Sequence, residues 1–275
     1  MTVRIAQISD AHLGASRDPF GPNFDLAAQH IRDARPDLLL ATGDLSLDGA
    51  DSDADLAAAW ARHAAIGVEW RAVPGNHDVG DEAALGGRQP WNGARAARWA
   101  TVAGPRCWLH DLPGWRLIGL DTQSLISDAG QWDFLAGALA DAGGRAIALV
   151  QHKPLTEQGL SDDAVNYWPV LPAPRGRLLA LLGGMRPALV LSGHLHMWRD
   201  RVGDGIRQVW APSTGFVVGD RWQEALGEKR IGWVEHHFHA DGTHDCVLRD
   251  IPLARPHDLG DMPEVYGPLE PVTQA

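Results

Sequence analysis

Short apolar runs alternate along most of the chain with stretches in which apolar residues recur every three or four positions. The short runs are typical of buried β-strands, and the periodic stretches are typical of helices with one buried face. Strands joined by helical crossovers form an α/β fold. The predicted strands are 3–9, 38–42, 69–73, 115–120, 146–150 and 188–192, and the predicted helices are 24–34, 54–66, 131–141 and 175–182.

The pattern changes after about residue 197. Shorter segments at 208–211, 232–239 and 245–249, separated by Gly, Pro and Asp, predict strands of a second sheet. A length of 275 residues suits one large domain as well as two small ones. We expect a single domain over 1–255, followed by a surface tail over 256–275 that is rich in proline and acidic residues.

Polar residues recur in one structural place, directly after the apolar runs. Ligands of open α/β sheets bind at the carboxyl ends of the strands, so residues far apart in sequence are expected to meet there. A lone carboxylate such as Asp121 more often caps a strand or bonds to a neighbouring side chain, and we leave it out of the predicted site. The residues in this place are Asp10, His12, Asp44, Asn76, His77, Asp121, His152, His194 and His196.

The spacing of these residues fits metal binding. Asp10 and His12 are two positions apart, so both side chains lean to the same side of an extended segment and can hold one ion. His194 and His196 repeat that spacing. Asp44 ends an aliphatic run, and the two oxygens of its carboxylate suit a bridge between two cations.

The segment Gly-Asn-His-Asp at 75–78 combines three kinds of chemical group. The Asn76 carbonyl oxygen is a neutral ligand, the His77 imidazole is a candidate acid, and Asp78 is a candidate to orient that imidazole. Any one of these motifs is common in proteins. Their combination in one chain is far more specific.

In this order, the motifs Asp-x-His, Gly-Asp, Gly-Asn-His-Asp, a later His and Gly-His-x-His resemble the blocks of the calcineurin-like metallophosphoesterase superfamily. The resemblance covers roughly the first 200 residues. It implies a four-layer α/β/β/α sandwich of two mixed β-sheets flanked by helices. It also implies two divalent ions, one held by Asp10, His12, Asp44 and His196 and the other by Asp44, Asn76, His152 and His194, so that Asp44 bridges them.

The resemblance also implies a mechanism. Two cations about 3.5 to 4 Å apart can generate hydroxide near neutral pH, polarise a phosphoryl group and neutralise charge during an in-line displacement. His77 would contact the phosphate and stabilise or protonate the leaving oxygen, and Asp78 would orient its imidazole. Oxygen and imidazole ligands leave manganese, iron, zinc and cobalt open as the metals.

The opening Ile-Ser-Asp-Ala-His-Leu resembles the bacterial cyclic-nucleotide phosphodiesterase and glycerophosphodiesterase group. Where that group often has His-His-Pro-Pro, this chain has Gln151-His152-Lys153-Pro154, so the ligand is kept and Lys153 replaces a neighbouring imidazole. The resemblance implies hydrolysis of a small phosphodiester. A phosphomonoesterase on the same site and a metal-binding scaffold without activity remain alternatives.

Composition narrows the partners and the location. A formal charge of −11 leaves no overall basic surface, so long nucleic acid is not an expected partner. Cys107 and Cys246 have no zinc-type spacing, and the start of the chain shows no leader pattern, so we expect a cytoplasmic protein. No apolar stretch approaches the roughly 18 residues that span a bilayer, so no membrane association is expected. The family resemblance also suggests a homodimer.

A histidine-rich segment and a long loop give two further predictions. The segment 235–239, Glu-His-His-Phe-His, looks like a second metal cluster, but we expect His236, His237 and His239 to have a surface or sheet role. The long Pro-containing loop 153–176 follows His152 directly and is predicted to form a substrate wall. Trp168 in this loop is the residue whose aromatic face we expect to meet the substrate.

Overall fold

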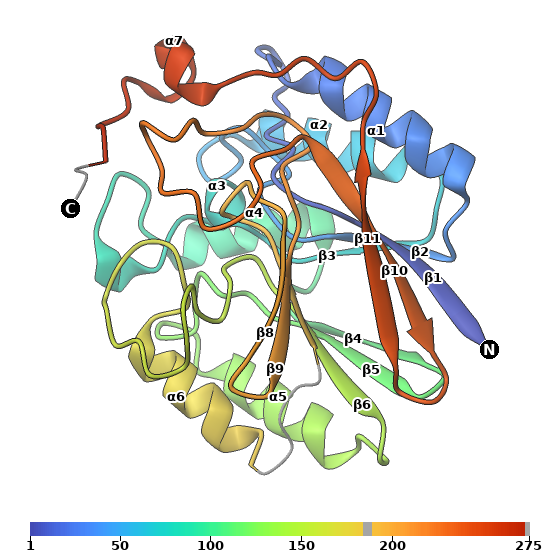
Figure 1. The fold of residues 1–275 in the computed structure, drawn as a ribbon. Coiled ribbons are helices and arrows are strands. Elements are labelled where there is room, and N and C mark those ends of the chain that lie inside the picture. The colour runs from blue at the N-terminus through green and yellow to red at the C-terminus, as the bar shows by residue number, and fades with distance from the viewer. Residues whose placement is uncertain (184–188, 273–275) are drawn as a thin grey trace.

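The structure, a computed structural model, describes residues 1–183 and 189–272. Its strands form two β-sheets that face each other, and helices cover the outer face of each sheet (Figure 1). The layers therefore follow the order α/β/β/α, which confirms the predicted sandwich of two mixed sheets. Within the described residues, no helix has the length and apolar character needed to cross a bilayer.

The first sheet has five strands. They are β1 (Thr2–Ile8), β2 (Leu38–Ala41), β3 (Trp70–Ala72), β10 (Gly232–His239) and β11 (His244–Asp250). Their order across the sheet is β11-β10-β1-β2-β3. β1, β2 and β3 are parallel, whereas β10 pairs antiparallel with both β1 and β11. The first strand of the chain is therefore central and is enclosed on one side by residues more than 200 positions later.

The second sheet has six strands. They are β4 (Trp108–Leu112), β5 (Trp115–Gly119), β6 (Ala146–Val150), β7 (Leu189–Ser192), β8 (Arg199–Gly203) and β9 (Ile206–Trp210). Their order is β4-β5-β6-β7-β9-β8. The four inner strands are parallel, and the two edge strands, β4 and β8, are antiparallel to their neighbours.

The helices pack on the outer faces of the two sheets. Those whose apolar side chains join the core of the first sheet are α1 (Gly21–Ala34), α2 (Asp53–Ala64) and α4 (Gly93–Ala103). Those on the second sheet are α5 (Gly130–Ala140) and α6 (Pro172–Leu181). The short elements are α3 (Asn76–Val79), η1 (Ala83–Leu85), η2 (Leu259–Asp261) and α7 (Pro263–Tyr266). Ser52 caps the N-terminus of α2, because its side chain accepts a hydrogen bond from the Asp55 backbone N–H.

Alternation along the strands divides the apolar side chains between core layers. Ile5 of β1 belongs to the core between the sheets, together with Leu40 of β2 and Val150 of β6. Ala6, the next residue, belongs to the outer core, together with Phe24 of α1. Because successive side chains of a strand point to opposite faces, a strand covered on both faces is apolar throughout. This explains the continuous apolar runs in the sequence.

The six predicted strands up to residue 192 form within one or two residues of their expected bounds, although Ala188 lies outside the described residues. The expectation that all segments after 197 join the second sheet is wrong in part. β9 joins it, together with β8, whereas β10 and β11 extend the first sheet beside β1. An alternating pattern indicates a strand but does not determine which other strand it pairs with. β4, β8 and α4 were not predicted.

The residues after 256, predicted to be a surface tail, are anchored to the rest of the chain. Leu259 is buried, and η2 and α7 pack on an apolar cluster that includes Phe20, Leu47 and Phe216. Backbone hydrogen bonds attach the segment as well, because the Leu259 N–H donates to Val217 O at 2.9 Å. Apolar residues of the segment, such as Leu259, Met262 and Val265, hold it against the cluster although the segment is rich in proline. Residues 273–275 of the predicted tail lie outside the described residues.

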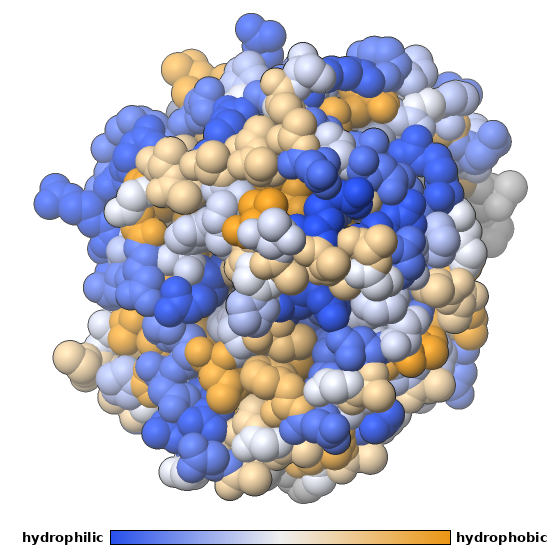
Figure 2. Space-filling model, turned by 180° about the vertical axis from the view of Figure 1, so that it is seen from behind, coloured by the Kyte–Doolittle hydropathy of each residue, from blue (hydrophilic) through white to orange (hydrophobic). Residues whose placement is uncertain are grey.

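Figure 2 shows the face opposite to that of Figure 1. Apolar and polar side chains are interspersed over the described part of this face, and blue polar side chains divide the orange areas. Scattered exposed apolar residues are normal for a protein surface and do not by themselves mark an interface. The predicted homodimer therefore stays a prediction.

Candidate metal centre

The candidate ligands lie within four residues of the ends of β1, β2, β3, β6 and β7, most of them in sharp turns, and Asn76 is the first residue of α3. At these turns the backbone enters the left-handed region, which residues other than glycine seldom adopt. Such conformations persist only where the surrounding structure holds them, and they concentrate at functional sites. The site residues with positive φ are Asp10 (53°), His12 (47°), Asp44 (51°), His194 (70°) and His196 (54°).

Two glycines allow these turns to approach one another. A Cβ atom on Gly75 would lie 2.1 Å from Asp44 Oδ1, and one on Gly193 would lie 2.6 Å from Asp10 Oδ2. Both distances are too short for any side chain. The glycines that precede the Asn-His-Asp and His-x-His motifs are therefore required for the ligands to meet.

Asp10, His12 and His196 form one group of ligand atoms. Asp10 Oδ1 lies 3.2 Å from His196 Nε2, and the three residues offer atoms that all lie within 4.8 Å of one another. The other Asp10 oxygen accepts the backbone N–H of His194 at 3.0 Å, which fixes the carboxylate. All of these side chains are buried.

Asp44, His152 and His194 form a second group. His152 Nε2 lies 3.3 Å from Asp44 Oδ2, 3.1 Å from His194 Nδ1 and 3.2 Å from Asn76 Oδ1. The same Asp44 oxygen lies 3.7 Å from His12 Nε2 of the first group. Asp44 therefore faces both groups, as the bridging role requires.

Buried ligand atoms without partners test whether cations fit here. Asp10 Oδ1 and His12 Nε2 are buried without a hydrogen bond, which is costly unless another species binds them. His152 Nδ1 lies 2.7 Å from the Thr42 carbonyl oxygen and donates its proton to that hydrogen bond, so Nε2 is the nitrogen directed at the other ligands and at a metal. The residues therefore fit two divalent cations.

The charge of Asp44 is set by its neighbours. Burial alone would raise the pKa of the Asp44 carboxyl, but the imidazoles of His152 and His77 outweigh burial and hold that pKa well below its usual range. The His77 backbone N–H also donates to Asp44 Oδ1 at 2.8 Å. Asp44 thus remains an anion with two oxygens available for cations.

The prediction that Asp78 orients the His77 imidazole is wrong. Asp78 is the third residue of α3, and its buried carboxylate accepts the backbone N–H groups of Gly75 at 2.9 Å and Ser46 at 3.0 Å. His77 Nδ1 instead lies 3.1 Å from the Leu47 carbonyl oxygen. Burial, followed by the charge of Asp44, raises the pKa of Asp78 to about 6. Asp78 positions the turns and does not orient the imidazole.

The family model for calcineurin-like phosphoesterases matches residues 3–198. The chain belongs to this family. A curated relative, named as a probable cyclic nucleotide phosphodiesterase of a Synechococcus species, is 28% identical over 210 residues, which cover 71% of this chain and 74% of the relative. Family membership supports a metal-dependent hydrolase of phosphate esters.

Solved structures agree on the fold of this calcineurin-like phosphoesterase. A purple acid phosphatase from yellow lupin superposes with a TM-score of 0.66 at 13% identity, covering 94% of this chain and 53% of the other. A dimetal phosphatase from Danio rerio gives 0.59 at 14% identity, covering 90% and 96%. GAP50, described as an anchor in the inner membrane complex of Plasmodium, gives 0.62 at 15% identity, covering 92% and 86%. At these identities the likeness shows the fold alone.

The calcineurin-like phosphoesterase fold brings all seven predicted ligands to one edge of the sandwich. Asp121 lies elsewhere: its carboxylate pairs with Arg106 and accepts a hydrogen bond from Ser124 at 2.7 Å. The histidines of β10 also lie outside the site. His236 bonds to Gln7 Oε1 and to His244 Nε2, both at 2.9 Å, so it links strands of the first sheet.

Two tyrosines belong to the site and were not predicted. Asn76 Nδ2 donates to the Tyr167 hydroxyl oxygen at 3.0 Å, and the Tyr266 hydroxyl lies 2.5 Å from His12 Nδ1. Tyr167 lies in the loop 153–176, next to the predicted wall residue Trp168. Tyr266 lies in the segment predicted to be a tail, and no motif in the sequence indicated it.

Lys153 connects the long loop to the site. Its side chain is buried, and its ammonium donates to Asp81 Oδ1 at 2.7 Å and to the Tyr167 carbonyl oxygen at 2.8 Å. Burial lowers the pKa of Lys153, and the charge of Asp81 opposes that shift. Lys153 thus holds the loop against the site and does not enter the ligand groups.

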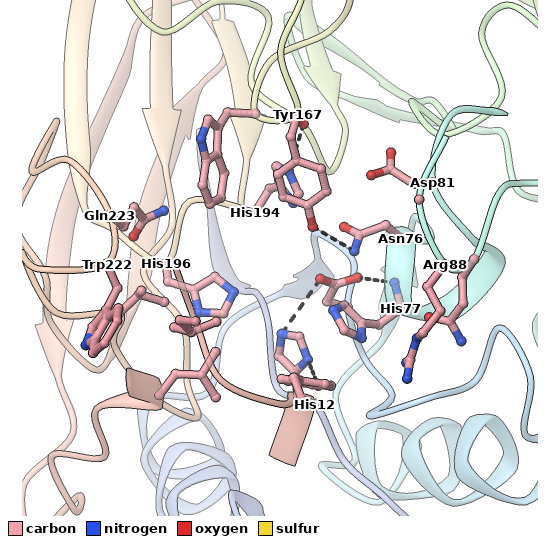
Figure 3. A pocket seen from close by; sticks show the side chains of 18 of the residues that line it. His12, Asn76, His77, Asp81, Arg88, Tyr167, His194, His196, Trp222 and Gln223 are labelled. Carbon is pink, nitrogen blue, oxygen red and sulfur yellow. Dashed lines mark hydrogen bonds and ion pairs between the residues drawn. The ribbon is translucent and has the colours of Figure 1, made fainter. Parts of the chain in front are cut away.

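A pocket of about 730 Å³ opens above the ligands. Figure 3 shows His196 and Trp222 on one side of it and Asp81 and Arg88 on the other. This volume lies within the range of about 300–1,000 Å³ typical of small-molecule sites. One wall is apolar and includes Phe216, Val218, Trp222, Leu259 and Leu269.

Proposed function

We propose that the chain is a binuclear metal-dependent phosphodiesterase that acts on a small phosphodiester, such as a cyclic nucleotide or a glycerophosphodiester. The observation that carries this proposal is the pair of ligand groups that share Asp44 at the floor of a pocket with one apolar wall. The curated relative, whose name describes a probable cyclic nucleotide phosphodiesterase, supports the diester.

Two divalent ions, when bound, would supply Lewis acidity toward phosphate oxygens and a nucleophile near neutral pH. Asp10, His12, Asp44 and His196 would hold one ion, and Asp44, Asn76, His152 and His194 the other. His77 lines the pocket, and its Nδ1 faces the Leu47 carbonyl. Its Nε2 is therefore the atom that would bind a phosphate oxygen and hold or deliver a proton to the leaving oxygen.

The apolar wall favours a diester over a monoester. A phosphodiester has a second ester arm, which needs a surface beside the reacting phosphate, whereas a monoester has none and carries one more negative charge. Trp222 lies on the side of the pocket where His196 lies (Figure 3), and the ring of Phe216 lies 4.4 Å from that of His196. Trp168 also lines the pocket. Aromatic side chains there would bury a base or another apolar arm.

If the chain is a phosphodiesterase, it should prefer a chromogenic diester to the corresponding monoester. Protein stripped of metal and reloaded with manganese should cleave bis(p-nitrophenyl) phosphate faster than p-nitrophenyl phosphate. The Asn76→Ala variant serves as the control, because it removes one ligand oxygen and should lose most of the turnover. Release of p-nitrophenol at equal enzyme concentration measures both reactions.

The other outcomes of this assay select between the alternatives. Faster cleavage of the monoester would assign the site to a phosphomonoesterase. Two bound ions without cleavage of either ester would make the chain a metal-binding scaffold. No dependence on added metal would contradict the proposal for the centre itself.

Trp168 is expected to contribute to substrate binding. Its ring lies 5.6 Å from the ring of His194 and 4.9 Å from that of Tyr167. Stacking of a base on an aromatic residue is worth about 1–3 kcal/mol, so Trp168→Ala should raise KM for an aromatic diester roughly tenfold, and Trp168→Phe should restore most of the binding. Steady-state kinetics and urea unfolding measure the two effects; loss of stability with an unchanged KM would make Trp168 a packing residue.

A further inference from the structure

The chain contains two tyrosines, and each contacts a different candidate metal ligand. Tyr266 meets His12 of the first group, and Tyr167 meets Asn76 of the second. They come from segments about 100 positions apart, and Tyr266 lies beyond the part of the chain that the family model matches.

The hydrogen bonds of Tyr266 determine which nitrogen of His12 is free. The Tyr266 hydroxyl donates to the Leu47 carbonyl oxygen at 3.3 Å, so its oxygen is free to accept a hydrogen bond from the His12 Nδ1–H group, with 2.5 Å between the two heavy atoms. His12 Nε2 is then left with a lone pair, and it is the buried atom that has no hydrogen bond and lies 3.7 Å from Asp44 Oδ2. Tyr266 thus selects the tautomer that can bind a metal.

The contact of Tyr167 determines which way the Asn76 amide points. The Nδ2 group of Asn76 donates to the Tyr167 hydroxyl oxygen at 3.0 Å, which turns Oδ1 toward His152 Nε2 at 3.2 Å. A rotation of the amide by half a turn would present two N–H donors to a cation instead of an oxygen. Tyr167 thus keeps the ligand oxygen directed at the second group.

We propose that Tyr266 and Tyr167 are positioning residues, one for each of the two metal ions, through the His12 tautomer and the Asn76 amide respectively. This inference rests on the proposed binuclear centre. The two hydroxyls act through ligands and need not touch the substrate. Orienting groups of this kind typically change metal affinity by about 10–100-fold.

The rings of both tyrosines also line the pocket, so the test must separate the hydroxyl from the ring. The ring of Tyr266 lies 4.7 Å from that of His77, and the ring of Tyr167 lies 4.7 Å from that of His194. Phenylalanine keeps these ring contacts and removes only the hydroxyl. Tyr266→Phe and Tyr167→Phe are therefore the variants of choice, and each is the matched control of the other.

Zinc binding measured against a competing chelator gives the first readout, independent of activity. Each variant should bind one zinc ion about 10–100-fold more weakly and keep its affinity for the other ion, and the double variant should be weakened at both. Trp60→Phe, in the outer core away from the pocket, should bind both ions as the unaltered chain does.

Labelling with 3-fluorotyrosine assigns the effect to each ion. The ¹⁹F spectrum should hold two signals, because the chain has two tyrosines, and each Tyr→Phe variant removes one of them. The two signals should shift with different zinc equivalents. In the Asn76→Ala variant the Tyr167 signal should lose its response to zinc while the Tyr266 signal keeps it.

Unchanged affinity for both ions in both Tyr→Phe variants would overturn the positioning roles, as would ¹⁹F signals that do not respond to zinc while two ions bind. Failure of the unaltered chain to bind two ions would contradict the proposed binuclear centre instead. The two failures are therefore distinguishable.

Discussion

Replacing His77 by alanine should lower kcat for the diester by about 10²–10⁴-fold, the usual contribution of a positioned acid or base. The bond that supports Asp44 comes from the His77 backbone N–H, so alanine preserves it. The side chain contacts Leu47 through Nδ1 and faces the pocket through the rest of its ring. Turnover and metal content, measured on the same protein sample, check the prediction.

The metal content decides between two roles for this residue. A ring nitrogen of His77 lies within 4.8 Å of ligand atoms of His12 and Asp44, which is close enough for the three residues to bind the same ion. Loss of one ion in His77→Ala would make His77 a ligand, and unchanged turnover would remove it from the mechanism. His30→Ala, on α1, provides a histidine control away from the pocket.

Replacing Lys153 by methionine should lower the free energy of unfolding by about 3 kcal/mol, the lower end of the range for breaking a buried ion pair. The Lys153 ammonium donates to Asp81 Oδ1 and to the Tyr167 carbonyl oxygen. The side chain of Lys153 is 2% exposed and that of Asp81 is 15% exposed. Methionine fills the space but leaves the Asp81 carboxylate without its cation.

Urea unfolding of three variants measures this effect. The double variant Lys153→Met with Asp81→Leu should recover most of the loss, because replacing both members of a buried pair with apolar groups is often nearly neutral. Asp81→Leu alone should destabilise, since it removes the carboxylate that pairs with the buried ammonium. A loss in the double variant as large as in Lys153→Met would show that packing, and not the unpaired charge, sets the cost.

The ligand positions could be predicted because each follows a buried strand. An apolar run that ends abruptly in Asp, Asn or His marks the carboxyl end of a strand, and parallel strands of both sheets bring those ends to one edge. Asp10, Asp44 and His152 show this most clearly. The sequence therefore indicated a site whose members are up to 186 positions apart, from Asp10 to His196.

The role of Asp78 could not be predicted from its place beside His77. Neighbouring residues of a helix point in different directions, so a carboxylate next to an imidazole does not face it. As the third residue of α3, Asp78 folds back to the N–H of Gly75, which is the usual direction for an acidic residue at that position. The helix is four residues long, too short to be evident from periodicity.

The pairing of β10 and the place of Tyr266 could not be predicted either. β10 adds to the first sheet through hydrogen bonds to β1, and a local pattern of alternating residues carries no information about so distant a partner. Tyr266 contacts His12 across 254 positions of sequence. Its segment is polar and rich in proline on average, and its few apolar residues, together with backbone hydrogen bonds, anchor it to the rest of the chain.

The contact between Tyr266 and His12 has a consequence for the order in which the protein is assembled during synthesis. His12 leaves the ribosome 254 residues before Tyr266 does. One edge of β1 likewise stays unpaired until β10 has been synthesised. In a nascent chain that lacks these segments, His12 has no Tyr266 hydroxyl to fix its tautomer. One edge of β1 is also unpaired. The metal centre can therefore be completed only after the ribosome has synthesised the chain as far as Tyr266.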